Sequence, residues 1–172
     1  FGLAFWSLSV SYWLTFGFSL LTSALSVRTF IIMHDCTHSS LLPSKRANEI
    51  LGFFTGLLTV TPFDQWRREH ALHHATSGDL DRRGYGDINT ITVDEYKARS
   101  KWGRFVYRVY RNPLTLLGVG PLYLILGQRW RTPSEGTLKK QLTNVWITNA
   151  AIVVMVVVPS MFFGFGPTML VF

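Results

Sequence analysis

The stretch "FIIMHDCTH", residues 30–38, places two histidines and an aspartate at the end of an apolar run. Imidazole and carboxylate groups are costly in apolar surroundings unless a partner compensates them. The run before them predicts a membrane helix over residues 13–33, because about 20 apolar residues cross the core of a bilayer. His34 and His38 are four residues apart, so a helix presents both from one face. This spacing predicts a pair of imidazoles at the end of a membrane helix.

The composition describes a polar middle between apolar ends. The chain has 172 residues, of which 48% are hydrophobic, 15% aromatic and only 16% charged. Residues 1–27 and 141–172 contain no charged side chain, and every lysine and arginine except Arg28 lies between Lys45 and Lys140. With such flanks, a net charge of +7 favours basic loops that face anionic lipid and the cytoplasm. We therefore expect an integral membrane protein with the bilayer as a partner and no nucleic acid.

The ends of the sequence lead us to expect a piece of a longer chain. The sequence begins with Phe1 rather than methionine and ends within the apolar stretch "PTMLVF". The start has neither the basic region nor the small-residue cleavage site of a signal peptide.

The N-terminal apolar region is too long for a single span. We expect a break near "SVSYW", with residues 1–9 as the tail of one helix and residues 13–33 as a full span. A second full span is expected over residues 142–163, directly after a pair of lysines. Cytoplasmic loops of membrane proteins contain an excess of basic residues. We therefore expect residues 34–141 to form a cytoplasmic and interfacial segment.

The polar middle contains several shorter predicted elements. "SSLLPSKRANE", residues 39–49, is expected to be a loop, and the apolar residues 50–63 a buried or interfacial helix. Gly52 and Gly56 form a GxxxG pattern, which is a weak packing signal at this length. "SGDLDRRGYGDINT" is expected to be a turn-rich polar loop.

A capping box predicts one helix from Thr92 to about Arg111. Thr92 and Glu95 have the spacing in which each side chain caps the other residue's backbone. An apolar stripe and a basic stripe follow, formed by Trp102, Phe105, Val106 and Val109 and by Lys101, Arg104, Arg108 and Arg111. This pattern predicts a helix on the membrane surface, with a solvated helix face as the alternative. Residues 113–127 are apolar but short, and we expect them to be interfacial or re-entrant.

All histidines of the chain fall in two clusters, "HDCTH" and "HALHH". The first cluster has the spacing i, i+4 and the second i, i+3, i+4, so a helix projects each set from one face. We therefore predict metal binding by His34, His38, His70, His73 and His74. Imidazole suits zinc, copper, iron and nickel. Cys36 lies two positions from His34 and from His38, so we expect it to pack rather than to bind metal.

Two other functions fit parts of this pattern. "HDCTH" looks like the HExxH motif of zinc proteases with Asp35 in place of glutamate, which indicates a zincin-like membrane metalloprotease. Asp35 is one methylene short for that role, and the second cluster has no part in the mechanism. A non-enzymatic haem or metal-binding membrane protein is the other alternative, but haem ligation requires opposed ligands from different helices.

The segment from "HDCTHSSLLPSKRANE" to "FDQWRREHALHHATSGDLD" resembles the membrane fatty acid desaturases, specifically the bacterial acyl-lipid group related to Δ12/ω6 enzymes. The similarity extends over residues 13–158. The resemblance implies an all-α integral membrane protein, multi-pass in the bacterial inner membrane, with a cytoplasmic helical cap that carries a di-iron histidine site. It implies O2-dependent introduction of a cis double bond into a fatty acyl lipid, with electrons from a ferredoxin or cytochrome b5 type donor. A related di-iron hydroxylase, acetylenase or ketolase is the alternative within the family.

The resemblance also implies roles for individual residues. It makes the five histidines ligands of two non-haem irons, with Asp35, Glu69, Asp79 and Asp81 as acceptors that orient imidazoles, or as partners of nearby arginines. Trp66 would line the acyl tunnel or anchor the chain at the interface. The family carries a third histidine box, whereas no histidine follows His74 here. We therefore expect residues 1–172 to be a partial desaturase domain that is inactive alone.

Overall fold

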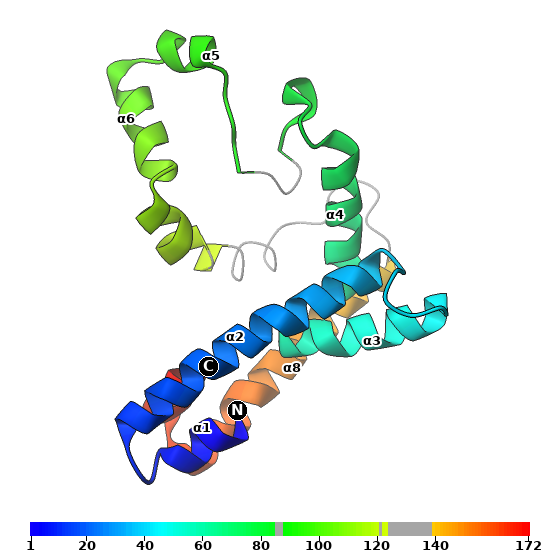
Figure 1. The fold of residues 1–172 in the computed structure, drawn as a ribbon, viewed down its shortest axis with the longest axis vertical. Coiled ribbons are helices and arrows are strands. Elements are labelled where there is room, and N and C mark those ends of the chain that lie inside the picture. The colour runs from blue at the N-terminus through cyan, green and yellow to red at the C-terminus, as the bar shows by residue number, and fades with distance from the viewer. Residues whose placement is uncertain (85–87, 121, 124–138) are drawn as a thin grey trace. The chain divides into compact units, whose positions relative to one another are not determined.

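The computed structural model describes residues 1–84, 88–120, 122–123 and 139–172 (Figure 1). Every regular element in these ranges is helical, which confirms the predicted all-helical class. The chain divides into two compact units. The first consists of Phe1–Gln65 with Leu138–Phe172, and the second of Trp66–Thr137.

The N-terminal helices of the first unit are separated where the sequence predicts a break. α1 (Gly2–Ser7) ends before a short turn, and α2 begins at Tyr12 after Ser11, which has extended backbone. The hydroxyls of Ser7 and Thr15 lie 2.9 Å apart and join the two helices across this turn. α2 (Tyr12–Thr37) continues four residues beyond the predicted end, so the first histidine cluster lies on its last turn.

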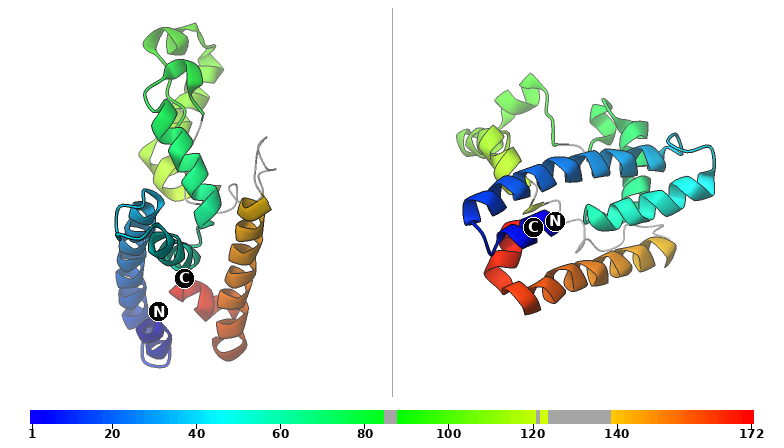
Figure 2. Two further views of the ribbon diagram at one scale, coloured as in Figure 1. Left: turned by 90° about the vertical axis from the view of Figure 1, so that its right-hand side faces the viewer. Right: turned by 60° about the horizontal axis from the view of Figure 1, so that its bottom comes forward.

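The C-terminal helices turn back toward the N-terminus. α8 (Lys139–Phe163) begins three residues before the predicted span and is followed by α9 (Phe165–Val171). Gly164 lies between them with φ of +82°, a conformation that favours glycine. α9 contacts α1, α2 and α8, and the rings of Phe1 and Phe172 lie 5.0 Å apart. The two termini of the chain therefore lie close together (Figure 2).

Among the residues that the structure describes, two helices are long and apolar enough to cross a membrane by length and composition. α2 has a mean hydropathy of 1.6 over its most apolar window, and α8 has 2.0. Only 6% of each of these apolar stretches is buried within the protein. The core helix of a soluble protein buries most of such a surface, so these two helices present their apolar side chains outward.

α3 (Lys45–Leu58) begins earlier than the sequence predicts, because its first turn falls inside the expected loop 39–49. The Ser44 hydroxyl accepts a hydrogen bond from the Ala47 amide and caps the helix. Asn48 is fully buried, and its side chain accepts from the Leu42 amide and donates to the Leu42 carbonyl. The loop is thus shorter than the sequence predicts. Asn48, expected to be a loop residue, is buried and holds the loop through its hydrogen bonds to Leu42.

The GxxxG pattern of α3 packs against the chain that follows it. A Cβ atom at Gly52 would lie 2.2 Å from the Phe63 ring, and one at Gly56 would lie 2.7 Å from the Thr61 carbonyl oxygen. Phe63 is only 2% exposed. The two glycines therefore make room for the turn that leads into α4 (Phe63–Thr76).

The second unit contains η1 (Leu80–Arg82), α5 (Val93–Ala98), α6 (Lys101–Tyr110) and η2 (Thr115–Val119). The capping box of Thr92 and Glu95 is present, but the single helix predicted to Arg111 is wrong. Arg99 is extended, and the Ser100 hydroxyl accepts from the Gly103 amide to start α6. A second N-cap therefore divides the helix. Part of the expected interfacial segment 113–127 lies outside the described residues.

Candidate metal centre

The first histidine pair lies at the end of α2. The rings of His34 and His38 are 4.8 Å apart between centroids, and His38 is the C-cap residue. Met33 and Cys36 lie close to these histidines in the sequence, and each is at most 1% exposed. Burial of this side fixes the last turn and leaves the two imidazoles on a more accessible side. It also agrees with the predicted packing role of Cys36.

Asp35 orients one of these imidazoles. Its Oδ1 lies 3.0 Å from Nδ1 of His34. An ionised carboxylate only accepts hydrogen bonds, so Nδ1 of His34 is the donor. The lone pair of His34 then lies on Nε2, which is the arrangement in which an acidic neighbour prepares a histidine for a metal.

The second histidine cluster lies on α4, whose first turn is fixed to α8. The Asp64 amide donates to Oδ1 of Asn144 at 3.1 Å, and Nζ of Lys140 lies 3.1 Å from the Asp64 carboxylate. Asn144 is 4% exposed, so this contact is nearly dry. Sequence reasoning missed these residues. The feature of the sequence that could have indicated this contact is the set of polar residues on the first half of α8, which includes Asn144 and Thr148.

The histidines of α4 approach one another within the helix. The Nε2 atoms of His70 and His74 lie 3.0 Å apart. Two neutral imidazole nitrogens at this distance share either a proton or a cation, because two lone pairs repel each other. Trp66 stacks on His70 with 4.3 Å between ring centroids and 19° between planes, so it covers one face of that imidazole.

Each unit contains a pair of histidines whose imidazoles lie close together, namely His34 with His38 in the first unit and His70 with His74 in the second. His73 lies on the same helix as the second pair, and its ring centroid lies 5.9 Å from that of His70. A donor set made only of imidazole nitrogens suits iron, zinc or copper rather than magnesium or calcium. The residues present therefore fit a transition metal.

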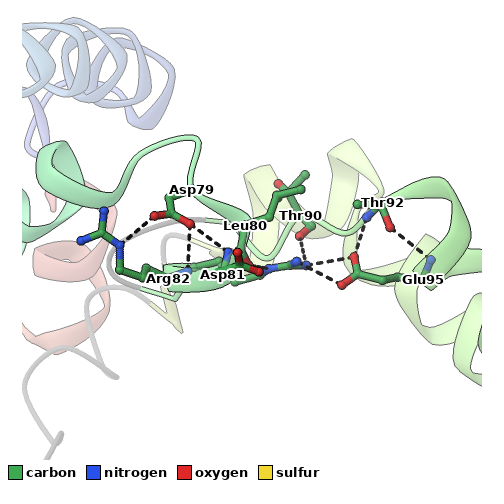
Figure 3. Close-up of polar contacts among 8 residues, drawn as sticks. Asp79, Leu80, Asp81, Arg82, Thr90, Thr92 and Glu95 are labelled. Atoms are coloured by element: carbon green, nitrogen blue, oxygen red, sulfur yellow. Dashed lines mark hydrogen bonds and ion pairs between the residues drawn. The ribbon is translucent and has the colours of Figure 1, made fainter.

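The remaining acids of the predicted site have different surroundings. Asp79 caps η1, because its carboxylate accepts from the amides of Asp81 and Arg82 (Figure 3). It also forms a 2.7 Å ion pair with Arg82, which, together with these backbone hydrogen bonds, lowers the pKa of Asp79. Asp79 thus follows the alternative prediction of an arginine partner. Glu69 lies on α4 directly before His70.

An ion pair that the sequence did not reveal closes the loop after the second histidine cluster. Both terminal nitrogens of Arg83 donate to the Glu95 carboxylate, at 3.1 and 3.0 Å, and Nη1 also donates to the Thr90 carbonyl (Figure 3). Glu95 additionally accepts from the Thr92 amide at 2.6 Å. The Arg83 guanidinium, followed by this amide, lowers the pKa of Glu95 to about 2.

Several known proteins are similar in sequence to this chain. The chain is 44% identical to a fatty acid desaturase of Bacillus subtilis over 98% of the chain and 48% of that protein. It is 34% identical to an sn-1 acyl-lipid omega-3 desaturase (ferredoxin) of Synechocystis over 62% of the chain and 28% of that protein. An sn-1 oleoyl-lipid 12-desaturase of Anabaena variabilis is 31% identical over 46% of the chain and 23% of that protein.

The chain thus spans about half the length of the Bacillus relative and less of the others. No solved structure matches it. The sequence model of the fatty acid desaturase family matches residues 11–172, and this protein therefore belongs to the fatty acid desaturase family.

Proposed function

We propose that this chain is part of a membrane-bound, non-haem di-iron desaturase that introduces a cis double bond into the acyl chain of a lipid. The observation that carries this proposal is that each of the two histidine clusters brings two imidazoles close together on its own helix, His34 with His38 and His70 with His74. Family membership supports the reaction class. The relatives from Anabaena and Synechocystis bear names that specify acyl lipids, which supports a lipid-linked substrate here.

The five histidines are the proposed iron ligands, namely His34, His38, His70, His73 and His74. Asp35 orients the His34 ring through Nδ1, and Trp66 restricts the position of His70. When bound, the irons supply the redox chemistry that activates O2 toward an unactivated C–H bond. Neutral imidazoles suit this site, because they bind the metal without adding negative charge beside an apolar substrate.

The overall reaction requires an external electron donor. Two hydrogens leave adjacent carbons of the acyl chain, and the donor supplies two electrons while two protons come from solvent, so that O2 is reduced to two waters. We propose a ferredoxin or cytochrome b5 type protein as this donor. The name of the Synechocystis relative includes ferredoxin, which supports the first of these.

The proposed location is the bacterial inner membrane, with residues 1–33 and 142–163 in the bilayer and residues 34–141 on the cytoplasmic side. The outward-facing apolar surfaces of α2 and α8 support two spans. The orientation rests on Lys139 and Lys140 at the start of α8, because basic residues accumulate beside the cytoplasmic ends of spans.

Five histidines do not complete a di-iron site in this family. We propose that further ligands come from a third histidine box in sequence outside these residues. The length of the Bacillus relative, of which this chain covers 48%, supports this proposal. The reading frame of the natural gene tests it directly, because an open frame that ends without such a box contradicts an active desaturase.

The decisive experiment uses the full natural protein purified from a host grown with iron. We expect a di-iron stoichiometry, no Soret band, and new double bonds in the membrane lipids of the expressing host. A Soret band indicates haem instead. One zinc per chain with peptidase activity contradicts the proposal, and hydroxylated acyl chains assign the protein to a related di-iron reaction.

A further inference from the structure

α6 presents three faces with different surroundings. Its tyrosine face folds onto its own unit, since the rings of Tyr107 and Tyr96 lie 6.0 Å apart and the Arg99 guanidinium lies 5.3 Å from the Tyr107 ring. The Tyr110 hydroxyl accepts a hydrogen bond from the Asn89 amide at 3.1 Å. The tyrosines therefore attach α6 to α5 and to the preceding loop.

The apolar face of α6 is left uncovered. Trp102 is 70% exposed, and its ring stacks on Phe105, with 5.4 Å between centroids. Val106 and Val109 complete this stripe and are also exposed. Leu114 and Leu117 follow on the next segment with 83% and 78% exposure. A contiguous apolar surface of this kind marks an interaction site in a folded protein.

The third face is basic and lies beside the apolar one. It consists of Lys101, Arg104, Arg108 and Arg111. The sequence contains no aspartate or glutamate between Glu95 and Glu135, so α6 and the residues that follow it carry only positive charge. This charge is complementary to an anionic surface.

We propose that α6 and η2 dock on a bilayer leaflet that contains anionic phospholipid. The apolar stripe enters the boundary between headgroups and acyl chains, and the basic stripe contacts lipid phosphates. An acidic electron-donor protein also complements the basic stripe, but it does not account for six exposed apolar side chains beside it. The bilayer accounts for both stripes. This docking surface goes beyond the proposed function, since it requires neither iron nor turnover.

The test uses the whole chain in nanodiscs with one environment-sensitive label. Cys36 is replaced by alanine, and the label is attached through Val106→Cys on the apolar face or, as a control, through Asp94→Cys on α5. Discs contain phosphatidylcholine alone or with phosphatidylglycerol, and a lipid-borne quencher reports depth. We expect the label at position 106 to be quenched about threefold or more in anionic discs, and the label at position 94 little.

A second set of variants separates charge from apolar contact. R104Q with R108Q is expected to abolish the difference between the two lipid compositions, as is high salt. Equal quenching in both discs overturns the anionic requirement, and equal quenching at positions 94 and 106 overturns the docking geometry. If the label at position 106 stays unquenched in anionic discs and shifts only when a reduced acidic ferredoxin is added, the surface belongs to a protein partner and the proposal is wrong.

Discussion

The backbone amide of Asp64 donates a hydrogen bond to Oδ1 of Asn144, and this 3.1 Å contact joins the first turn of α4 to α8 across 80 residues of sequence. The carboxylate of Asp64 pairs with Lys140, one turn earlier on α8. Phe63, the residue before Asp64, is buried against Gly52 of α3. The start of the helix that carries the second histidine cluster is therefore held by two other helices.

Asn144→Leu is expected to destabilise this attachment. The variant removes the acceptor from a nearly buried amide without changing side-chain length much, which costs about 1–3 kcal/mol of unfolding free energy. Denaturant titration of the detergent-solubilised protein measures this cost. Thr143→Leu changes the neighbouring exposed residue and is the control. Equal unfolding free energies for the two variants contradict the role of Asn144.

Gly52→Ala is expected to displace Phe63. The added Cβ would lie 2.2 Å from the Phe63 ring, well below ordinary contact distance. Overpacking of this kind costs about 1–3 kcal/mol, measured as a loss of thermal or denaturant stability. Gly17→Ala is the matched control, because a Cβ there meets no atom within 4 Å. Alanine favours a helix over glycine by up to about 1 kcal/mol, so the control is expected to be neutral or stabilising.

The ion pair of Arg83 and Glu95 predicts a dependence on pH. The pKa of Glu95 falls from an ordinary 4.5 to about 2 in the folded protein. The pair therefore stabilises the loop above pH 4.5, and this contribution is lost as the pH falls toward 2. Carbon NMR of the Glu95 carboxyl group measures the midpoint directly.

Arg83→Gln is expected to raise the Glu95 pKa toward its ordinary value, since the guanidinium is the largest cause of the shift. Arg82→Gln is the control, because Arg82 pairs with Asp79 instead. A midpoint that stays near 2 in R83Q shows that the Thr92 amide, rather than the ion pair, sets the pKa.

Asp35→Asn tests the orienting role of the carboxylate at the proposed centre. The uncharged amide is a weaker acceptor for Nδ1 of His34, and loss of such a partner typically lowers metal affinity by about 10- to 100-fold. Competition with a chelator, followed by metal analysis of the full natural protein, measures this change. Asp94→Asn, on exposed α5, is expected to retain the metal. An unchanged metal affinity in D35N contradicts the orienting role of Asp35.

Local patterns in the sequence predicted the helical class, the break before α2 and the capping box at α5. Each depends on residues a few positions apart, so no distant contact is needed to define it. The prediction of a single helix over residues 92–111 was wrong because it relied on such local patterns alone. Its periodicity continues through Arg99, and only the cap formed by Ser100 interrupts it. The expected loop 39–49 was too long, because Asn48 is polar by composition but buried by its contacts with Leu42.

The sequence by itself determined that two histidine clusters exist and that each one presents its imidazoles from one helix face. That conclusion follows from the helical repeat alone. Only the tertiary structure decided that Asn144 holds the start of α4, that Gly52 accommodates Phe63, and that the 70% exposed Trp102 remains uncovered. These outcomes depend on which residues, far apart in the sequence, pack against one another and form hydrogen bonds with one another. No periodicity along the chain encodes such pairings.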